Sequence, residues 1–155
     1  MSIEIKEIET DKLGDALKKV ILLPQNYLSG NDLNYHSTTL SFYKYSKDLL
    51  DIEYYSEPEV LVEQRSGEWF GPVLLLTSLA INENPQLPSI ICSVIANYVT
   101  DFFKGQKKPN IKLKVIFKET KSSKVTEISY EGDTEGLSKL ESSILEVAKK
   151  GKDSE

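Results

Sequence analysis

The stretch LPSIICSVIANYVTDFFKG, residues 87–105, decides the fold of this 155-residue chain. Its apolar side chains recur every three or four positions and fall on one broad face of a helix, whereas most of its polar side chains fall on the other. Pro88 suits the first helical turn, and Gly105 suits the position just past the end. The pattern predicts an amphipathic helix that forms the spine of the core, and burial of its apolar face is worth on the order of 10 kcal/mol before entropy is subtracted. That face comprises Ile90, Ile91, Val94, Ile95, Tyr98, Val99 and Phe102.

Nothing in the chain is typical of a membrane or secreted protein. A spanning helix needs about 20 mostly apolar residues, but the apolar run 73–81 is far shorter and polar side chains interrupt 87–105. Residues 1–12 alternate apolar and charged side chains and lack the apolar stretch of a signal peptide. Cys92 is the one cysteine, so no internal disulfide can form. We therefore expect a cytoplasmic protein with no membrane partner.

The C-terminal third predicts a β-hairpin. In residues 111–118 the apolar side chains alternate with lysines, and residues 124–132 return with the same period of two. One face of the hairpin is therefore expected to be buried, and the other to carry lysines. The expected buried face holds Ile111, Leu113, Val115, Phe117, Thr126, Ile128 and Tyr130, and the other face holds Lys112, Lys114 and Lys118 with Ile116 among them.

A second amphipathic helix is expected after the hairpin. Asp133 suits its N-terminal cap, and a stripe of apolar residues at helical spacing follows, while the tail 151–155 is polar and is expected to fray. The sequence thus predicts the α+β class: a single domain over 1–150, in which 88–150 form a helix–β-hairpin–helix unit packed on the apolar central helix. The stripe contains Leu137, Leu140, Ile144 and Ala148.

The first 87 residues give mixed patterns, and the secondary structure of 25–60 and 71–82 stays open between helix and strand at this point. Read in order, the residues indicate an edge strand at 3–8, a helix from Thr10 or Asp11 to Val20 that Pro24 ends, a loop at 25–36, a helix opened by Ser37 or Thr38, a strand at 51–55, a helical turn opened by Pro58 and a turn at 65–72.

The sequence contains few residue patterns that are typical of catalytic or cofactor-binding sites. His36 is the only histidine, so with one cysteine the chain cannot supply a typical zinc site. Nothing local to Cys92 offers a partner base, which indicates a packed thiol. No phosphate-binding glycine loop or dinucleotide-binding fingerprint occurs. We expect no catalytic residue, no metal and no cofactor.

An acidic segment leaves one enzymatic alternative open. Residues 48–68 hold seven acidic residues and one arginine. Asp51 followed by Glu63 and Arg65 imitates the carboxylates of a metal-dependent nuclease, although arginine replaces a titratable lysine poorly. A metal-dependent hydrolase or nuclease is the first alternative, beside a simple solvated acidic face.

A basic segment balances the acidic one. Residues 104–124 hold eight lysines and one acidic residue. The two blocks either neighbour each other in the fold, face water, or steer a partner or a second copy of the chain. A phosphate- or nucleotide-binding module that uses Lys112, Lys114 and Lys118 is the second alternative. Nucleic acid is disfavoured, because the net charge is −5 and the lysine face lacks interleaved aromatic side chains.

The segment RSGEWFGP, residues 65–72, is the best candidate for an interaction site. It holds the only arginine, Arg65, and the only tryptophan, Trp69, with Phe70 beside it. Arginine and aromatic residues dominate the binding energy of protein interfaces. We expect these three side chains to contact another protein or a second copy of this chain.

The C-terminal block resembles the bacterial effector-associated constant components, which accompany nucleotide-powered conflict systems. The likeness covers residues 88–148: an apolar helix that ends in Tyr98, Phe102 and Phe103, a basic exit through Lys104 to Lys108, the strand IKLKVIF, and, after the hairpin turn, the stretch YEGDTEGLSKLESSILEV. The resemblance implies a non-catalytic adaptor in a bacterial defence operon and supplies no site residues. Together with the residue patterns, it leads us to expect a non-enzymatic protein-interaction domain.

Overall fold

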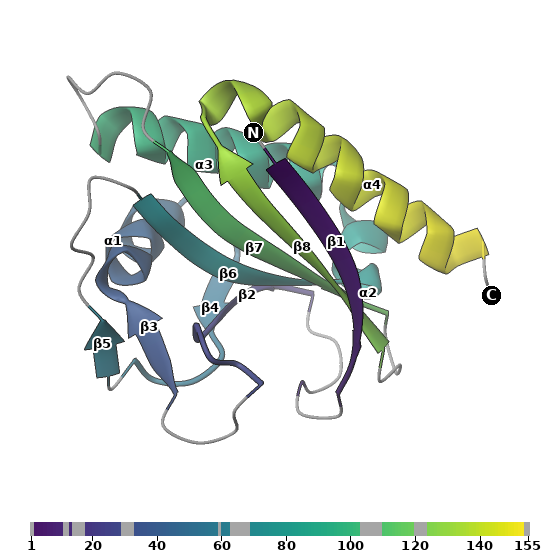
Figure 1. Cartoon of the computed structure of the whole chain (residues 1–155), viewed down its shortest axis with the longest axis horizontal. Coiled ribbons are helices and arrows are strands. Elements are labelled where there is room, and N and C mark those ends of the chain that lie inside the picture. Colours follow the sequence, from purple (N-terminus) through teal and green to yellow (C-terminus); the bar gives the residue numbers. More distant parts are fainter. Residues whose placement is uncertain are drawn as a thin grey trace.

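A six-stranded mixed sheet organises the chain, and the order of its strands is β1-β8-β7-β6-β2-β4 (Figure 1). The sheet draws strands from both ends of the sequence, and with its helices it confirms the α+β class. This computed structural model describes residues 2–10, 13, 18–28, 33–58, 60–62, 69–102, 110–119 and 124–153. The strands are β1 (Ser2–Glu9), β2 (Val20–Leu23), β4 (Ile52–Tyr54), β6 (Trp69–Thr77), β7 (Ile111–Lys118) and β8 (Lys124–Gly132).

The sheet combines antiparallel and parallel pairs. Strand β8 pairs antiparallel with both β1 and β7, whereas β7 and β6 run parallel. Strand β2 is antiparallel to β6 and parallel to β4. A separate two-stranded parallel sheet joins β3 (Asn34–His36) to β5 (Val60–Val62).

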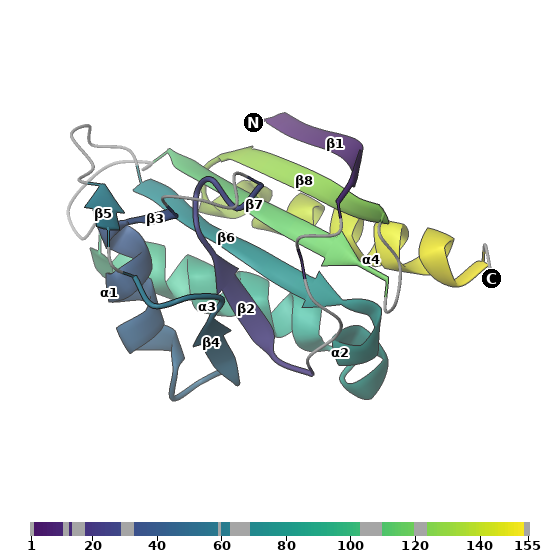
Figure 2. The same ribbon diagram turned by 90° about the horizontal axis from the view of Figure 1, so that it is seen from below.

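The main helices lie together on one face of the large sheet, as Figure 2 shows. They are α1 (Ser37–Ser46), α3 (Leu87–Phe102) and α4 (Leu137–Asp153), while the short α2 (Ser78–Glu83) follows β6 and the 3-10 turn η1 (Thr134–Gly136) precedes α4. The opposite face of the sheet carries no helix among the described residues, and we call it the open face. No described helix is long and apolar enough to cross a membrane.

Helix α3 is the spine that its sequence predicts. Ile91, Ile95 and Val99 are completely buried in the core between the sheet and the helices. Phe102 is an exception to the prediction, because its side chain is 48% exposed at the end of the helix. It stacks on the ring of Tyr98 at a centroid distance of 5.4 Å.

The hairpin β7–β8 has the predicted buried face, but its other face is partly buried as well, because Ile116 and Val125 belong to a second apolar cluster there. Its odd-numbered β7 side chains, Ile111 to Phe117, lie in the core beneath the helices. The turn into α4 follows the prediction too, since the Asp133 side chain accepts a hydrogen bond from the backbone of Gly136 at 3.2 Å. Helix α4 continues through Asp153, so the expected fraying of the tail is wrong for residues 151–153.

Several N-terminal predictions are wrong, because buried apolar runs form strands where helices or turns were expected. Val20 begins strand β2 instead of ending a helix; most of that predicted helix, 11–12 and 14–17, lies outside the described residues. The segment after Pro58 forms β5, a run of β-branched and apolar residues that suits a strand. Residues 69–72 belong to β6, and the register shift between Phe70 and Val73 accommodates a proline within the strand.

Candidate interaction surface on the open face and at strand β1

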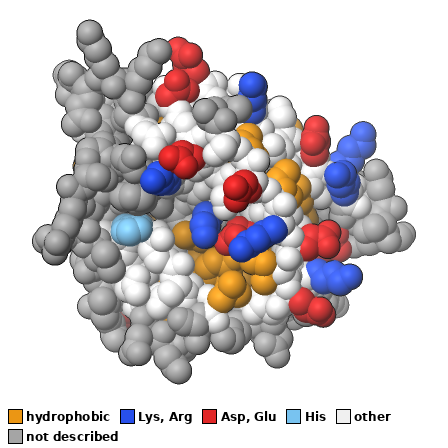
Figure 3. Space-filling view, viewed as in Figure 1, with side chains coloured by type: hydrophobic (Ala, Val, Ile, Leu, Met, Phe, Trp, Pro, Cys, Tyr) orange, Lys and Arg blue, Asp and Glu red, His pale blue; other side chains and the backbone are white. Residues whose placement is uncertain are grey.

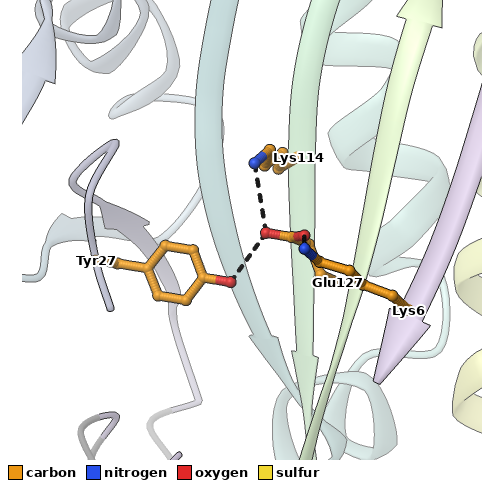
Figure 4. Close-up of polar contacts among 4 residues, drawn as sticks. All are labelled: Lys6, Tyr27, Lys114 and Glu127. Carbon is orange, nitrogen blue, oxygen red and sulfur yellow. Dashed lines mark hydrogen bonds and ion pairs between the residues drawn. The ribbon is translucent and has the colours of Figure 1, made fainter. Parts of the chain in front are cut away.

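A buried carboxylate lies on the open face, on the strand next to the border strand β1. The Glu127 side chain is 5% exposed, and it contacts both Lys6 (Oε2 to Nζ, 3.3 Å) and Lys114 (Oε1 to Nζ, 3.5 Å). The Tyr27 hydroxyl donates a hydrogen bond to Glu127 Oε1 at 3.0 Å. We call these four residues the Glu127 cluster (Figure 4).

The sheet register explains how the Glu127 cluster assembles. Glu127 on β8 lies directly opposite Lys6 on β1, and Lys114 projects from the neighbouring strand β7. Tyr27 comes from the turn after β2, and its ring points across the sheet toward the carboxylate (Figure 4). Burial of a carboxylate is costly unless charges and donors compensate it. The cluster therefore fixes three strands and the turn after β2 in one arrangement.

The Tyr27 hydroxyl is kept in its neutral, donating form. Burial raises the pKa of Tyr27 above its ordinary value, and the adjacent Glu127 carboxylate raises it further. A neutral phenol can donate to a carboxylate, whereas a phenolate would repel it. The contact is thus a hydrogen bond from a neutral phenol to a carboxylate.

The three lysines proposed for anion binding do not present a single positive surface. Lys114 belongs to the Glu127 cluster, and Lys112 pairs with Glu131 at 3.8 Å. Lys118 is 3% exposed, and its ammonium group donates to the carbonyl of Leu13 at 3.2 Å. Basic and acidic side chains are accordingly interspersed on the face that Figure 3 shows.

A cavity of about 300 Å³ opens on the same face. Gln25, His36 and Ser129 line it together with Lys112 and Glu131. His36 ends β3 and stands at the N-terminal boundary of α1, where the sequence predicted a loop. The charged lining residues are Glu4, Lys112, Lys114 and Glu131, so the lining offers no excess of either sign, and Lys112 pairs with Glu131.

The acidic segment forms a surface ion pair. Lys19 contacts Glu53 at 2.7 Å and Asp51 at 3.8 Å, and the hydrogen bond with Glu53 raises the pKa of Lys19. Glu59, Glu63 and Glu68 lie outside the described residues. Within the described ranges, no group of three or more histidine, cysteine or acidic side chains is placed to hold a metal ion.

The predicted interaction residues fall mostly outside what the structure describes. Arg65 lies in the undescribed range 63–68. Trp69 and Phe70 belong to β6, where their backbones are in register with Ile111 and Lys112 of β7. Nothing is described of their side chains, so the interaction site expected at these three residues stays a prediction.

Cys92 is the packed thiol that the sequence predicts. Its side chain is buried in the core on α3. Burial raises the pKa of Cys92 to about 12, with a further contribution from the negative charge of Glu141. A thiol with such a pKa is almost entirely protonated near neutral pH and is a poor nucleophile.

Strand β1 is an open border of the sheet. All eight of its residues are in register with β8, and no described strand lies on its other side (Figures 1 and 2). A strand at a border leaves half of its backbone N–H and C=O groups pointing outward. We call this strand with its outward groups the β1 edge. The sequence predicted an edge strand here, and the position of β1 at the border of the sheet confirms it.

An apolar side chain marks the β1 edge. Ile5 is 51% exposed, and it lies in a groove of about 540 Å³ between β1 and α4. Phe117 and Val147 contribute apolar lining to this groove, and Glu7 and Lys150 contribute charge. Leu145, elsewhere on α4, is 42% exposed. The β1 edge thus combines outward-pointing backbone groups with a side chain that gains by burial.

Comparison of the chain with protein-family models, with curated proteins and with solved structures returned no match.

Proposed function

We propose that this chain is a non-enzymatic adaptor that acts through protein contacts, and that the β1 edge is its main contact surface. An extended segment of another polypeptide would extend the sheet by pairing with β1. The observation that carries the proposal is the position of β1 at the border of the sheet with a half-exposed isoleucine at its centre.

Strand addition is a recurrent way in which proteins recognise one another. Backbone hydrogen bonds supply affinity, and the alternate side chains of the strands supply specificity. Proteins commonly protect an exposed edge with prolines, bulges or charges. Here charges alternate with isoleucines along the strand, and Ile5 remains uncovered beside the groove. That pattern favours a selective contact over a blocked edge.

The Glu127 cluster supports the same function by making β1 a rigid template. Lys6 is held by its ion pair with the buried carboxylate of Glu127 at 3.3 Å. An incoming segment would meet a strand that is already in its bound conformation, which reduces the entropic cost of association. The resemblance to effector-associated constant components favours a partner within a bacterial defence system.

Affinity capture with matched variants tests this function. The tagged wild-type protein would be compared with Ile5→Lys and with Leu49→Lys, because Leu49 is 56% exposed and lies in the turn after α1, away from β1. We expect a stoichiometric protein partner to be captured by the wild type and by Leu49→Lys but not by Ile5→Lys. Capture that is equal for both variants would show that the contact surface lies elsewhere.

The variant Trp69→Ala, compared with Ile5→Lys, tests the segment 65–72, which holds the only arginine and the only tryptophan of the chain. Trp69→Ala would lower capture if that side chain contributes to the same interface. Because Trp69 belongs to β6, separated from β1 by β7 and β8, loss of capture in Trp69→Ala with full capture in Ile5→Lys would assign the adaptor contact to the 65–72 segment.

A further inference from the structure

We propose that the occupant of the β1 edge is β1 of a second copy of this chain, paired antiparallel about a two-fold axis that passes through Ile5. The proposal rests on the proposed role of the β1 edge as a protein-contact surface. It goes further by naming the partner strand and its register. The two six-stranded sheets would then form one continuous sheet across the pair.

Symmetry restricts the possible registers. Residues that lie opposite each other in antiparallel strands point to the same face, and a two-fold axis normal to the sheet keeps the faces of both copies aligned. The axis must therefore pass through a residue and cannot lie midway between two residues. Strand β1 has eight residues, so most of its length is paired only when the axis lies near the middle of the strand. The possible positions of the axis are therefore Glu4, Ile5, Lys6 and Glu7.

Charge selects one of these four registers. An axis through Glu4, Lys6 or Glu7 places a charged side chain directly opposite its own copy, and like charges in that position destabilise a strand pair. An axis through Ile5 places Glu4 of each copy opposite Lys6 of the other, so two opposite-charge pairs form on the open face. Glu4 makes no ion pair with any described residue of its own chain, which leaves its carboxylate available.

The apolar side chains favour the same register. Ile5 is 51% exposed in the single chain, and its copy would lie directly opposite on the helix-bearing face, beside the groove between β1 and α4. Pairing would remove both isoleucines from water and add backbone hydrogen bonds on the outer side of each strand. Lys6 would keep its contact with Glu127 and gain Glu4 of the second copy as a further partner.

A cysteine cross-link tests the register directly. In an Ile5→Cys variant, the two new cysteines would have their Cα atoms about 4.5 to 5.5 Å apart, within the range of a disulfide. In the matched control Glu7→Cys, the two copies would be offset by about 13 Å along the strands, out of reach. Both residues are exposed and point to the same face. The native thiol of Cys92 is buried and does not interfere.

The purified protein alone is oxidised mildly, and covalent dimer is measured on non-reducing gels. We expect Ile5→Cys to form dimer at least about tenfold faster than Glu7→Cys. Equal rates, or no dimer from Ile5→Cys, would overturn the proposed register.

Charge reversal gives an independent measurement that needs no oxidation. In Glu4→Lys, the new lysine of each copy would lie opposite Lys6 of the other copy, which places two pairs of like charges across the dimer. Glu7→Lys changes the net charge by the same amount, but its lysine lies opposite Ile3. We expect sedimentation equilibrium to show that Glu4→Lys raises the dimer dissociation constant by about tenfold and Glu7→Lys by much less. A wild-type protein that stays monomeric when concentrated, while Ile5→Lys still abolishes capture of a different protein, would overturn self-pairing and leave the adaptor function intact.

Discussion

Tyr27 donates a hydrogen bond across 3.0 Å to Glu127, a residue 100 positions further along the chain. The contact joins the turn after β2 to the fourth residue of β8 and thus links two segments that lie far apart in the sequence. It also completes the shell around a carboxylate that is only 5% exposed. Because Lys6 of β1 shares that carboxylate, the hydrogen bond also supports the geometry of the β1 edge.

Replacement of Tyr27 by phenylalanine tests this link. The variant removes one donor from a buried carboxylate, which costs about 1 to 3 kcal/mol in the free energy of unfolding. Urea denaturation followed by circular dichroism measures the change. Tyr45→Phe is the matched control, because the Tyr45 hydroxyl has no hydrogen bond to a described residue and the control should change stability by less than about 0.5 kcal/mol. Equal effects of the two substitutions would contradict a special role for the Glu127 cluster.

From the buried hydroxyl of Tyr54 we predict how the free energy of unfolding changes at alkaline pH. Its buried hydroxyl has no hydrogen-bond partner among the described residues, and burial raises the pKa of Tyr54 to about 12, with smaller contributions from Tyr43 and Tyr35. The pKa of Tyr54 in the folded state exceeds its value near 10 in the unfolded state, so the folded state resists ionisation of this hydroxyl. The resulting contribution to the free energy of unfolding is present below pH 10 and is lost as the pH rises from 10 to about 12.

The Tyr54→Phe variant removes that titration. We expect its free energy of unfolding at neutral pH to equal or exceed that of the wild type by up to about 1 kcal/mol, because a buried hydroxyl without a partner is lost. We also expect a shallower fall in stability as the pH rises above 10. Urea midpoints at pH 7 and at several values above pH 9 provide the measurement. A fall as steep as that of the wild type would exclude Tyr54 as a source of the pH dependence.

Cys92 should resist modification in the folded protein. Burial and a pKa of about 12 leave both access and thiolate concentration low at pH 8. We expect iodoacetamide labelling, followed by mass spectrometry, to be more than about a hundredfold slower than for the chain in guanidinium chloride. Fast labelling without unfolding would place Cys92 at the surface and reopen a reactive role for it.

The predictable parts of the fold are those whose patterns are local. The alternation of residues 111–118 fixes which β7 side chains face the helices, and the apolar stripe of residues 87–105 fixes the buried face of α3. The helix predicted to end at Val20 was wrong, because Leu13, Leu17 and Val20 share a helical spacing while the apolar run Val20–Leu23 suits a buried strand. Residues 69–72 were predicted as a turn because they contain glycine and proline, although they belong to strand β6.

The candidate surface was less predictable, because it depends on contacts between distant residues. Lys118 has the same alternation as Lys112 and Lys114, but its ammonium group is buried against the carbonyl of Leu13, 105 positions away. Nothing local in KVTEISYEG distinguishes the buried Glu127 from an exposed carboxylate. The exposure of Ile5 likewise depends on how far α4 covers β1, which the strand sequence does not encode.

The role of the β1 edge as a protein-contact surface is tested most directly by residue-resolved amide hydrogen exchange. In dilute protein, alternate amides of β1 should exchange rapidly, because only those that point to β8 are hydrogen-bonded. In concentrated protein or with a captured partner, the outward amides of Ser2–Glu9 should become protected, while those of β4 at the opposite border should not change. Unchanged exchange in β1 under conditions where association is complete would contradict the role assigned to this strand.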